Sequence, residues 1–205
     1  MLHKVELPYP NKYIFQFDKS QPVSSTADYL QKNILANYQL PILEVLELGC
    51  GCGIISIMLS LVQKQWHVMG IDIEPAFINL AILNNQLCRT SCSFIESDLR
   101  DLSKSLYNRF DLVLSNPPWQ KKGSGHLSPN RLRAISRHEI LCTMEDVLSA
   151  CQLSIKPDGK VWLVYPTIRK EDLFMATKNS LLDIIDILEP TDSNDYFISI
   201  LKNRG

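Results

Sequence analysis

Four polar residues of this chain stand at the ends of short apolar runs: Glu47, Asp72, Asp98 and Asn116. The runs have the length of buried strands, and helical patterns separate them. Strands that alternate with helices form a parallel sheet, and ligands bind beyond the carboxyl ends of its strands. Carboxylate and amide oxygens accept hydrogen bonds. The spacing therefore predicts a polar ligand site along one edge of a sheet.

A glycine-rich loop follows the first of these strands, within the stretch from Glu44 to Ile55. Because glycine has no Cβ, Gly49, Gly51 and Gly53 let the backbone turn sharply and approach a ligand closely. Strand, glycine loop and helix in this order open a nucleotide-type site. A dinucleotide site of the NAD or FAD type needs a third small residue where this chain has the bulky Ile54, so the spacing argues against that type.

Two carboxylates flank the glycine loop. Glu47 lies two residues before Gly49 in a buried strand, where a carboxylate needs a partner, and a cationic ligand such as a sulfonium amino acid would supply one. Asp72 ends the second strand and has the position of an acid that accepts hydrogen bonds from both ribose hydroxyls. The alternative for Asp72 is a structural cap on the helix that begins at Pro75.

These residues resemble motif I of the class I S-adenosylmethionine-dependent methyltransferases. The resemblance implies that the glycine loop holds the methionine part of the cofactor, Asp72 the ribose and Asp98 the adenine. S-adenosylhomocysteine would be the product. The expected cofactor-binding set is Glu47, Gly49, Cys50, Gly51, Gly53, Asp72, Ile73, Asp98, Leu99 and Asn116. The alternative is a glycine-rich turn without a ligand.

A second motif, from Asn116 to Trp119, follows the fourth strand. Its two prolines, Pro117 and Pro118, make a rigid, extended turn. Such a turn can present the Asn116 side-chain oxygen and the Pro117 carbonyl to the two hydrogens of a planar amino group, and Trp119 can stack on a flipped-out base. The motif resembles motif IV of methyltransferases that modify adenine N6, cytosine N4 or glutamine N5, although most of these have tyrosine or phenylalanine at the position of Trp119.

The segment from Gln120 to His138 contains no Asp or Glu and is the main concentrated basic stretch in a chain of net charge −1. Its position after the second motif predicts contacts with an RNA phosphate backbone; the alternative is a solvated basic loop. The expected substrate-binding residues are Lys121, Lys122, Arg131, Arg133 and Arg137.

The stretch from Glu44 to Pro166 resembles the bacterial tRNA(Val) adenine-N6 methyltransferase family. That resemblance implies transfer of a methyl group to adenine N6 of a tRNA or another structured RNA. Two alternatives stay open: a protein glutamine-N5 methyltransferase, and a non-catalytic S-adenosylmethionine-binding partner of another RNA enzyme.

The predicted fold is α/β: a Rossmann-like, doubly wound, mostly parallel seven-stranded methyltransferase sheet with helices on both faces. We expect one domain, 1–205, with an N-terminal arm and helix at 1–40 and a catalytic core at 41–205. Lys156 to Lys160 is predicted as a turn before a strand from Val161 to Tyr165, since Pro-Asp-Gly favours turns.

The composition excludes some classes of protein. At 45% hydrophobic and 21% charged residues, the chain has the composition of a globular domain. It contains no apolar run long enough to span a membrane and no signal-peptide pattern, so we expect a cytoplasmic protein with no membrane partner. The spacing of the six cysteines does not favour a metal site. The oligomeric state is left open.

Overall fold

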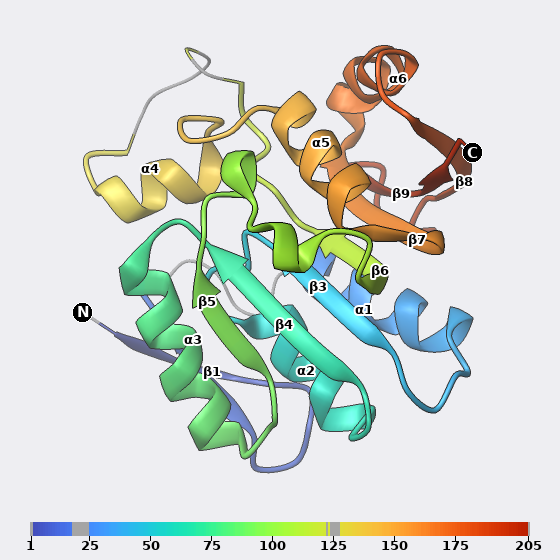
Figure 1. The fold of residues 1–205 in the computed structure, drawn as a ribbon. Helices are drawn as coiled ribbons and strands as arrows, with labels where there is room; N and C mark the ends of the chain where they lie inside the picture. Colours follow the sequence, from blue (N-terminus) through green and yellow to red (C-terminus); the bar gives the residue numbers. More distant parts are fainter. Residues whose placement is uncertain (1, 18–24, 122, 124–127, 205) are drawn as a thin grey trace. The chain divides into compact units, whose positions relative to one another are not determined.

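The computed structural model describes residues 2–17, 25–121, 123 and 128–204. The chain divides into two compact units, Met1–Asp98 and Leu99–Gly205, which run from blue to green and from green to red in Figure 1. Among the described residues, no helix has the length and apolar character needed to cross a membrane.

Unit 1 contains a three-stranded parallel sheet in the order β5-β4-β3. Its strands are β3 (Glu44–Leu48), β4 (His67–Asp72) and β5 (Ser93–Glu96). Four of the five residues of β3 are buried, which is typical of a parallel strand covered on both faces. The register pairs Glu47 with Gly70.

The helices of unit 1 are α1 (Ser25–Asn37), α2 (Ile54–Val62) and α3 (Pro75–Cys88). Helix α2 contacts α1, α3 and β4, and its residues 55–60 are all buried. An antiparallel hairpin, β1 (His3–Glu6) and β2 (Tyr13–Gln16), contacts α3 through β2. The N-terminal arm expected within residues 1–40 therefore contains a two-stranded hairpin.

Unit 2 contains strands in the order β6-β7-β9-β8. They are β6 (Phe110–Ser115), β7 (Ile155–Pro166), β8 (Leu182–Leu188) and β9 (Tyr196–Asn203). Strands β6 and β7 are parallel, whereas β9 is antiparallel to both β7 and β8. The two units together contain the seven strands of the predicted, mostly parallel, Rossmann-like fold.

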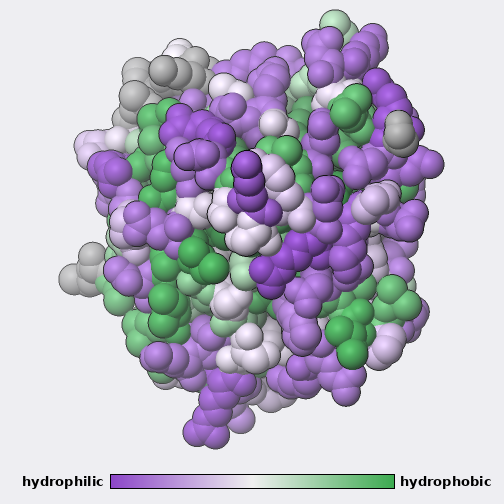
Figure 2. Space-filling model, in the orientation of Figure 1, coloured by the Kyte–Doolittle hydropathy of each residue, from purple (hydrophilic) through white to green (hydrophobic). Residues whose placement is uncertain are grey.

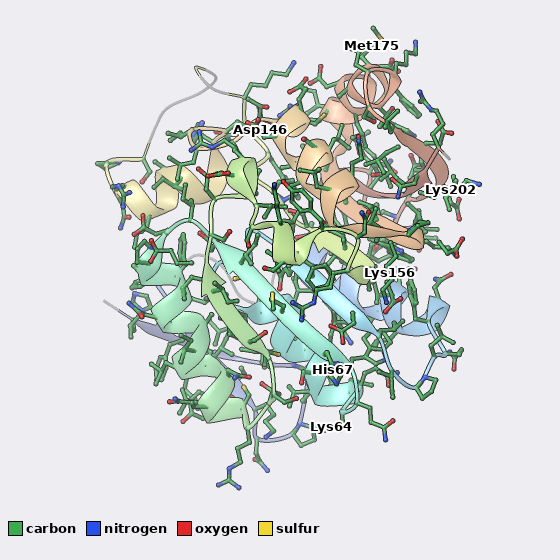
Figure 3. All side chains as sticks on the ribbon, in the orientation of Figure 1. Lys64, His67, Asp146, Lys156, Met175 and Lys202 are labelled. Atoms are coloured by element: carbon green, nitrogen blue, oxygen red, sulfur yellow. The ribbon has the colours of Figure 1, made fainter. Side chains whose placement is uncertain are left out.

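The helices of unit 2 are α4 (Arg131–Arg137), α5 (Met144–Ser154) and α6 (Lys170–Lys178). Three short 3-10 turns are η1 (Leu99–Asp101), η2 (Lys104–Leu106) and η3 (Thr167–Arg169). Helix α5 starts with a capping box: the Thr143 side chain accepts a hydrogen bond from the Asp146 backbone N–H at 3.2 Å, and the Asp146 carboxylate accepts one from the Thr143 N–H at 2.8 Å. Asp146 is labelled in Figure 3. Helix α4 lies inside the segment that was predicted only as a polar, basic stretch.

The prediction of a turn at 156–160 was wrong, because this segment lies inside β7. The β6–β7 register steps from Phe110 opposite Ile155 to Leu112 opposite Lys160, so the extra residues of β7 form a bulge. Gly159 is needed there, since an added Cβ would lie 2.6 Å from the Ile155 side chain. The turn-forming residues therefore bend a strand without ending it.

The surface drawn in Figure 2 is mostly hydrophilic, and apolar side chains gather over α3 and β5 of unit 1. The exposed apolar residues of these two elements are Ile82, Leu83, Leu87 and Ile95.

Candidate functional site

The glycine loop of unit 1 has left-handed backbone at all three glycines, with φ of 67° at Gly49, 53° at Gly51 and 80° at Gly53. A Cβ added at Gly53 would lie 2.7 Å from the Phe94 ring, so this glycine is required for packing. A Cβ at Gly49 or Gly51 would meet no atom within 4 Å. The first two glycines therefore border open space, as a loop that receives part of a ligand must do.

Glu47 is 2% exposed, and its carboxylate lies against the first turn of α2. The backbone N–H of Ser56 donates to Glu47 Oε2 at 2.9 Å, and the Ser56 hydroxyl donates to the same oxygen. Burial raises the pKa of Glu47 to about 7, although the bonds from Ser56 lower it. The expectation that this carboxylate needs a partner is met by Ser56, and its contact with the methionine part of the cofactor stays a prediction.

Asp72 joins the end of β4 to the glycine loop. Its Oδ2 accepts a hydrogen bond from the Gly51 N–H at 2.9 Å, and its Oδ1 accepts one from the Glu74 N–H at 2.9 Å. Burial raises the pKa of Asp72, against these two bonds. Asp72 thus fixes the loop and the residue that precedes α3, and its role toward the ribose stays a prediction. Each carboxylate oxygen can accept a second hydrogen bond, so these two bonds do not exclude a role toward ribose hydroxyls.

The predicted adenine-side residues belong to different units of the chain. Ile73 follows β4 directly and is half-buried. Asp98 is half-buried and ends unit 1, two residues beyond β5, whereas Leu99 begins η1 in unit 2. The Ser97 N–H donates to the Asp72 carbonyl at 3.0 Å, which holds the end of β5 beside that of β4.

Asn84 of α3 holds the glycine loop to the N-terminal hairpin, and sequence reasoning did not find it. Its side chain is completely buried. The amide nitrogen donates to the Phe15 carbonyl at 2.9 Å and to the Cys52 carbonyl at 3.0 Å, and the amide oxygen accepts from the Phe15 N–H at 2.8 Å. A single asparagine in a helix carries no local signal of such partners, which are 32 and 69 residues away in the chain.

The motif from Asn116 to Trp119 follows β6 in unit 2, with Pro117 buried and the other three residues half-buried. The Trp119 indole N–H donates to Asn116 Oδ1 at 3.2 Å. The Trp119 ring lies 6.3 Å from the Tyr196 ring, at an interplanar angle of 32°. Tryptophan therefore adds a donor that the phenylalanine of related motifs lacks, and this donor orients the Asn116 amide. We call residues 116–119 the acceptor turn.

The predicted RNA-binding residues are only partly described. Lys121 Nζ lies 2.8 Å from Asp172 Oδ2, so its charge is balanced within unit 2. Arg131 is exposed at the start of α4. Lys122 lies outside the described residues, as do the side chains of Arg133 and Arg137. The prediction of a phosphate-binding patch did not take Asp172 into account, because this residue lies 51 positions after Lys121 in the chain.

The cysteines near the loop are thiols. Burial raises the pKa of Cys50 well above its usual range and that of Cys52 to about 11, so both are protonated at neutral pH. In the described ranges, no group of three or more His, Cys, Asp or Glu side chains is placed to hold a metal ion.

Comparison with known families and proteins identifies the fold. The model of the methyltransferase small domain family matches residues 25–178. The tRNA1(Val) (adenine(37)-N6)-methyltransferase of Porphyromonas gingivalis is 32% identical over 135 residues, which cover 62% of this chain and 51% of that protein. The release factor glutamine methyltransferase of Lactococcus lactis is 33% identical over 90 residues, covering 44% of this chain and 32% of that one. The chain spans about half the length of the first of these relatives.

Solved structures agree with this match. The 16S rRNA N2 G1207 methyltransferase RsmC of Thermus thermophilus, in complex with AdoMet and guanosine, superposes with a TM-score of 0.69 at 14% identity, covering 100% of this chain and 50% of that one. TrmN of Thermus thermophilus superposes with a TM-score of 0.61 at 20% identity, covering 86% and 48%. These likenesses confirm the predicted seven-stranded, Rossmann-like methyltransferase fold.

The residues present fit the cofactor that this family implies. The open space beside Gly49 and Gly51 leaves room for a ligand against the backbone, and the Asp72 carboxylate lies next to that space because it binds the Gly51 N–H. Because the family model covers three quarters of its residues, the chain belongs to the methyltransferase small domain family, whose cofactor is S-adenosylmethionine.

Proposed function

We propose that the protein methylates an exocyclic amino nitrogen, namely adenine N6 of a tRNA. The observation that carries this proposal is the acceptor turn: an Asn-Pro-Pro-Trp sequence directly after β6, with the Asn116 side-chain oxygen oriented by the Trp119 indole N–H at 3.2 Å. A module that only binds the cofactor has no need of two fixed acceptors for amino hydrogens.

In this proposal, unit 1 binds the cofactor. When bound, S-adenosylmethionine supplies a methyl group on a positively charged sulfur. Gly49 and Gly51 admit the methionine part, and Glu47 fixes the loop and the first turn of α2 through Ser56. Asp72 holds the ribose hydroxyls with the lone pairs that the Gly51 and Glu74 N–H groups do not use. The roles of Ile73, Asp98, Leu99 and Asn116 toward the cofactor rest on the family resemblance.

The acceptor turn prepares the target nitrogen. Its lone pair is delocalised into the base, so the free amino group is a poor nucleophile. Asn116 Oδ1 and the Pro117 carbonyl each accept one amino hydrogen, which favours a tetrahedral nitrogen with its lone pair directed at the methyl carbon. The nitrogen would take up the methyl group that the bound cofactor supplies, and one amino proton would then pass to solvent. Trp119 supplies an aromatic surface for the base.

The choice of tRNA rests on sequence similarity. The name of the Porphyromonas gingivalis relative states an adenine-N6 methyltransferase that acts on tRNA1(Val), and a relative of the same name from Vibrio cholerae is 26% identical over 140 residues. The basic segment from 120 to 138 supports an RNA substrate, even though Asp172 balances the charge of Lys121.

A second candidate is methylation of a protein glutamine at N5. It is favoured by relatives named as release factor glutamine methyltransferases, at 33% identity over 90 residues and 24% over 161. A glutamine amide has the same planar NH2 as adenine, so the acceptor turn serves both. The third possibility, a non-catalytic partner of an RNA enzyme, would bind the cofactor and transfer nothing.

One experiment separates the three. Purified protein and cofactor labelled on the methyl group are mixed with total RNA and with total protein, both from cells that lack this gene product. Label recovered as N6-methyladenosine after nucleoside digestion is the expected result. Label recovered as methylglutamine would show that the substrate is a protein. Cofactor binding without any methyl transfer would show that the protein is not a methyltransferase.

A further inference from the structure

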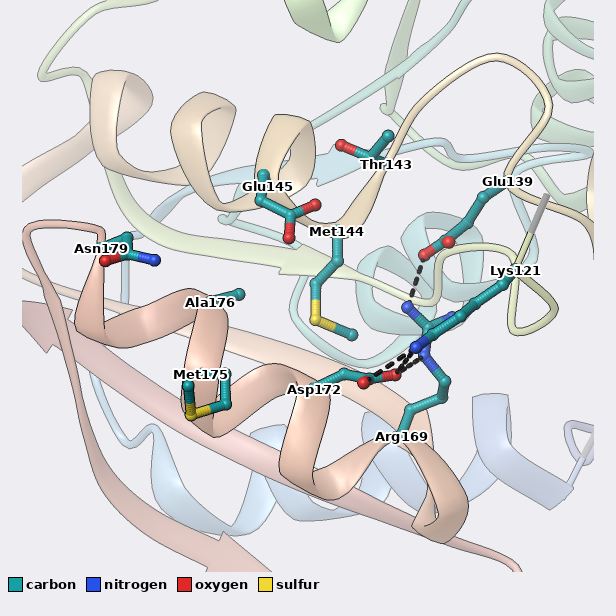
Figure 4. Close-up of a pocket in the computed structure, with 10 residues that line it drawn as sticks. All are labelled: Lys121, Glu139, Thr143, Met144, Glu145, Arg169, Asp172, Met175, Ala176 and Asn179. Carbon is teal, nitrogen blue, oxygen red and sulfur yellow. Dashed lines mark hydrogen bonds and ion pairs between the residues drawn. The ribbon is translucent and has the colours of Figure 1, made fainter.

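Arg169 is a buried arginine of η3, and its side chain is 7% exposed. It lines a pocket of about 350 Å³ in unit 2 (Figure 4). Its guanidinium makes three different bonds: Nε donates to Asp172 Oδ2 at 2.6 Å, Nη2 donates to Glu139 Oε1 at 2.9 Å, and Nη1 donates to the backbone carbonyl of Trp119 at 3.1 Å. The rigid guanidinium fork thus connects α6, the segment after α4 and the acceptor turn.

The charges around Arg169 are matched. The Glu139 side chain is 10% exposed, and Asp172 is half-buried. Burial alone would lower the pKa of Arg169, but the hydrogen bonds with Glu139 and Asp172 outweigh it and raise that pKa. The guanidinium is therefore charged at all working pH values, and its geometry is fixed by three acceptors.

Two neighbours extend this anchoring beyond Trp119. The Gln120 carbonyl accepts a hydrogen bond from the Glu139 N–H at 2.8 Å. Lys121 Nζ lies 2.9 Å and 2.8 Å from the two oxygens of Asp172. The last residue of the acceptor turn is thus bound by Arg169 itself, and the two residues that follow it are bound by Glu139 and Asp172, the carboxylate partners of Arg169.

A path leads from this anchor to the proposed reacting group. Arg169 holds the backbone of Trp119, and the Trp119 indole N–H holds the side-chain oxygen of Asn116. The indole also lies beside the ring of Tyr196. A shift of the Trp119 backbone therefore moves the donor that orients Asn116.

We propose that Arg169 is a positioning residue for methyl transfer, which holds the acceptor turn through the Trp119 carbonyl. This inference rests on the proposed function. Arg169 lies outside the glycine loop and the acceptor turn, and its bond to the turn goes to the Trp119 carbonyl, not to Asn116 Oδ1 or the Pro117 carbonyl. It acts through Trp119 on Asn116, so its loss changes the rate of transfer more than it changes the binding of either substrate.

The test uses the full chain with Arg169→Ala and Arg169→Lys, compared with wild type and with the control Lys170→Ala. Lys170 is the next residue, and it carries the same charge in an ion pair with the more exposed Glu189. For Arg169→Ala we expect kcat to fall on the order of 10²-fold with KM nearly unchanged, since misplacement of reacting groups has this cost. Lysine lacks the fork and should restore little, and Lys170→Ala should behave as wild type.

Chemical rescue adds a readout that a purely structural role would not give. Because Arg169 lines the pocket, millimolar guanidinium ion can enter the space left in Arg169→Ala and should raise its kcat several-fold, with no gain for wild type. If Arg169→Ala fails to fold because Glu139 is left unpaired, the double variant Arg169→Gln, Glu139→Gln removes both charges and should still show the lowered kcat.

A spectroscopic readout keeps the test independent of the substrate. In ¹⁵N-labelled protein, the indole N–H signal of Trp119 is assigned by its loss in Trp119→Phe. We expect this signal to shift in Arg169→Ala and to stay in place in Lys170→Ala. An unmoved signal together with unchanged kcat would overturn the proposal, as would a raised KM at unchanged kcat. A wild-type protein that transfers no methyl group would refute the proposed function instead, and the indole signal would still test the anchoring.

Discussion

Replacing Glu47 with glutamine should remove a pH dependence of stability that this one carboxyl group causes. The group is buried, and its pKa rises from 4.5 to about 7 in the folded chain. Between these values the folded state binds more protons than the unfolded state, so this group's contribution to stability is present at low pH and is lost as the pH rises through 7. Glutamine keeps the shape and an oxygen acceptor for Ser56 but does not ionise.

The magnitude follows from the pKa. Each tenfold change in acidity corresponds to 1.36 kcal/mol, so full ionisation of Glu47 costs about 3 kcal/mol of unfolding free energy. Most of this loss falls between pH 5.5 and pH 8, where it amounts to about 2 kcal/mol. The difference in unfolding free energy between Glu47→Gln and wild type should therefore change by about 2 kcal/mol, in favour of the variant at pH 8.

The assay is urea unfolding at pH 5.5 and pH 8, followed through tryptophan fluorescence. Trp66 is a buried probe within unit 1, so unfolding of the unit that contains Glu47 changes this signal, to which Trp119 and Trp162 of unit 2 also contribute. Other titrating groups cancel, because wild type and variant share them. A difference between the two proteins that is the same at both pH values would refute the reasoning, since Glu47 would then have the same pKa in the folded and unfolded chain.

Two further predictions concern the cofactor-binding unit. Gly51→Ala should weaken cofactor binding in calorimetry, with a stability cost of only about 1–2 kcal/mol for its left-handed backbone. Gly53→Ala should lower the melting temperature more, because its Cβ would lie 2.7 Å from Phe94. A larger loss of stability in Gly51→Ala than in Gly53→Ala would contradict the argument that Gly51 borders open space. Asp72→Ala should raise the cofactor dissociation constant about tenfold or more, since it removes the carboxylate that accepts hydrogen bonds from the ribose hydroxyls and from the Gly51 N–H. An unchanged dissociation constant would show that Asp72 does not bind the cofactor.

The elements with strong local signals were predicted from the sequence. The glycine loop lies between strand β3 and helix α2, and the motif that begins at Asn116 follows strand β6, both as predicted. A buried parallel strand, a glycine loop and an apolar helix each follow from residue types within about ten positions. The acceptor turn was equally local, because two prolines fix the backbone wherever they occur.

What sequence reasoning missed depends on residues far apart in the chain. Ser56 as the partner of Glu47, Asn84 as the clamp of the glycine loop and Arg169 as the anchor of Trp119 are pairings across 9, 32 and 50 positions. Each is a common polar residue without a motif of its own. The ion-pair partner of Lys121 was missed for the same reason, since Asp172 lies outside the basic segment.

The measurement that tests the central claim most directly is methyl transfer by Asn116→Ala at saturating cofactor, with cofactor binding measured on the same protein. The control is Asn37→Ala, which removes an exposed asparagine at the end of α1. We predict that Asn116→Ala still binds the cofactor and transfers methyl groups on the order of 10²-fold more slowly, the cost of one oriented acceptor. Turnover close to that of wild type would contradict the account.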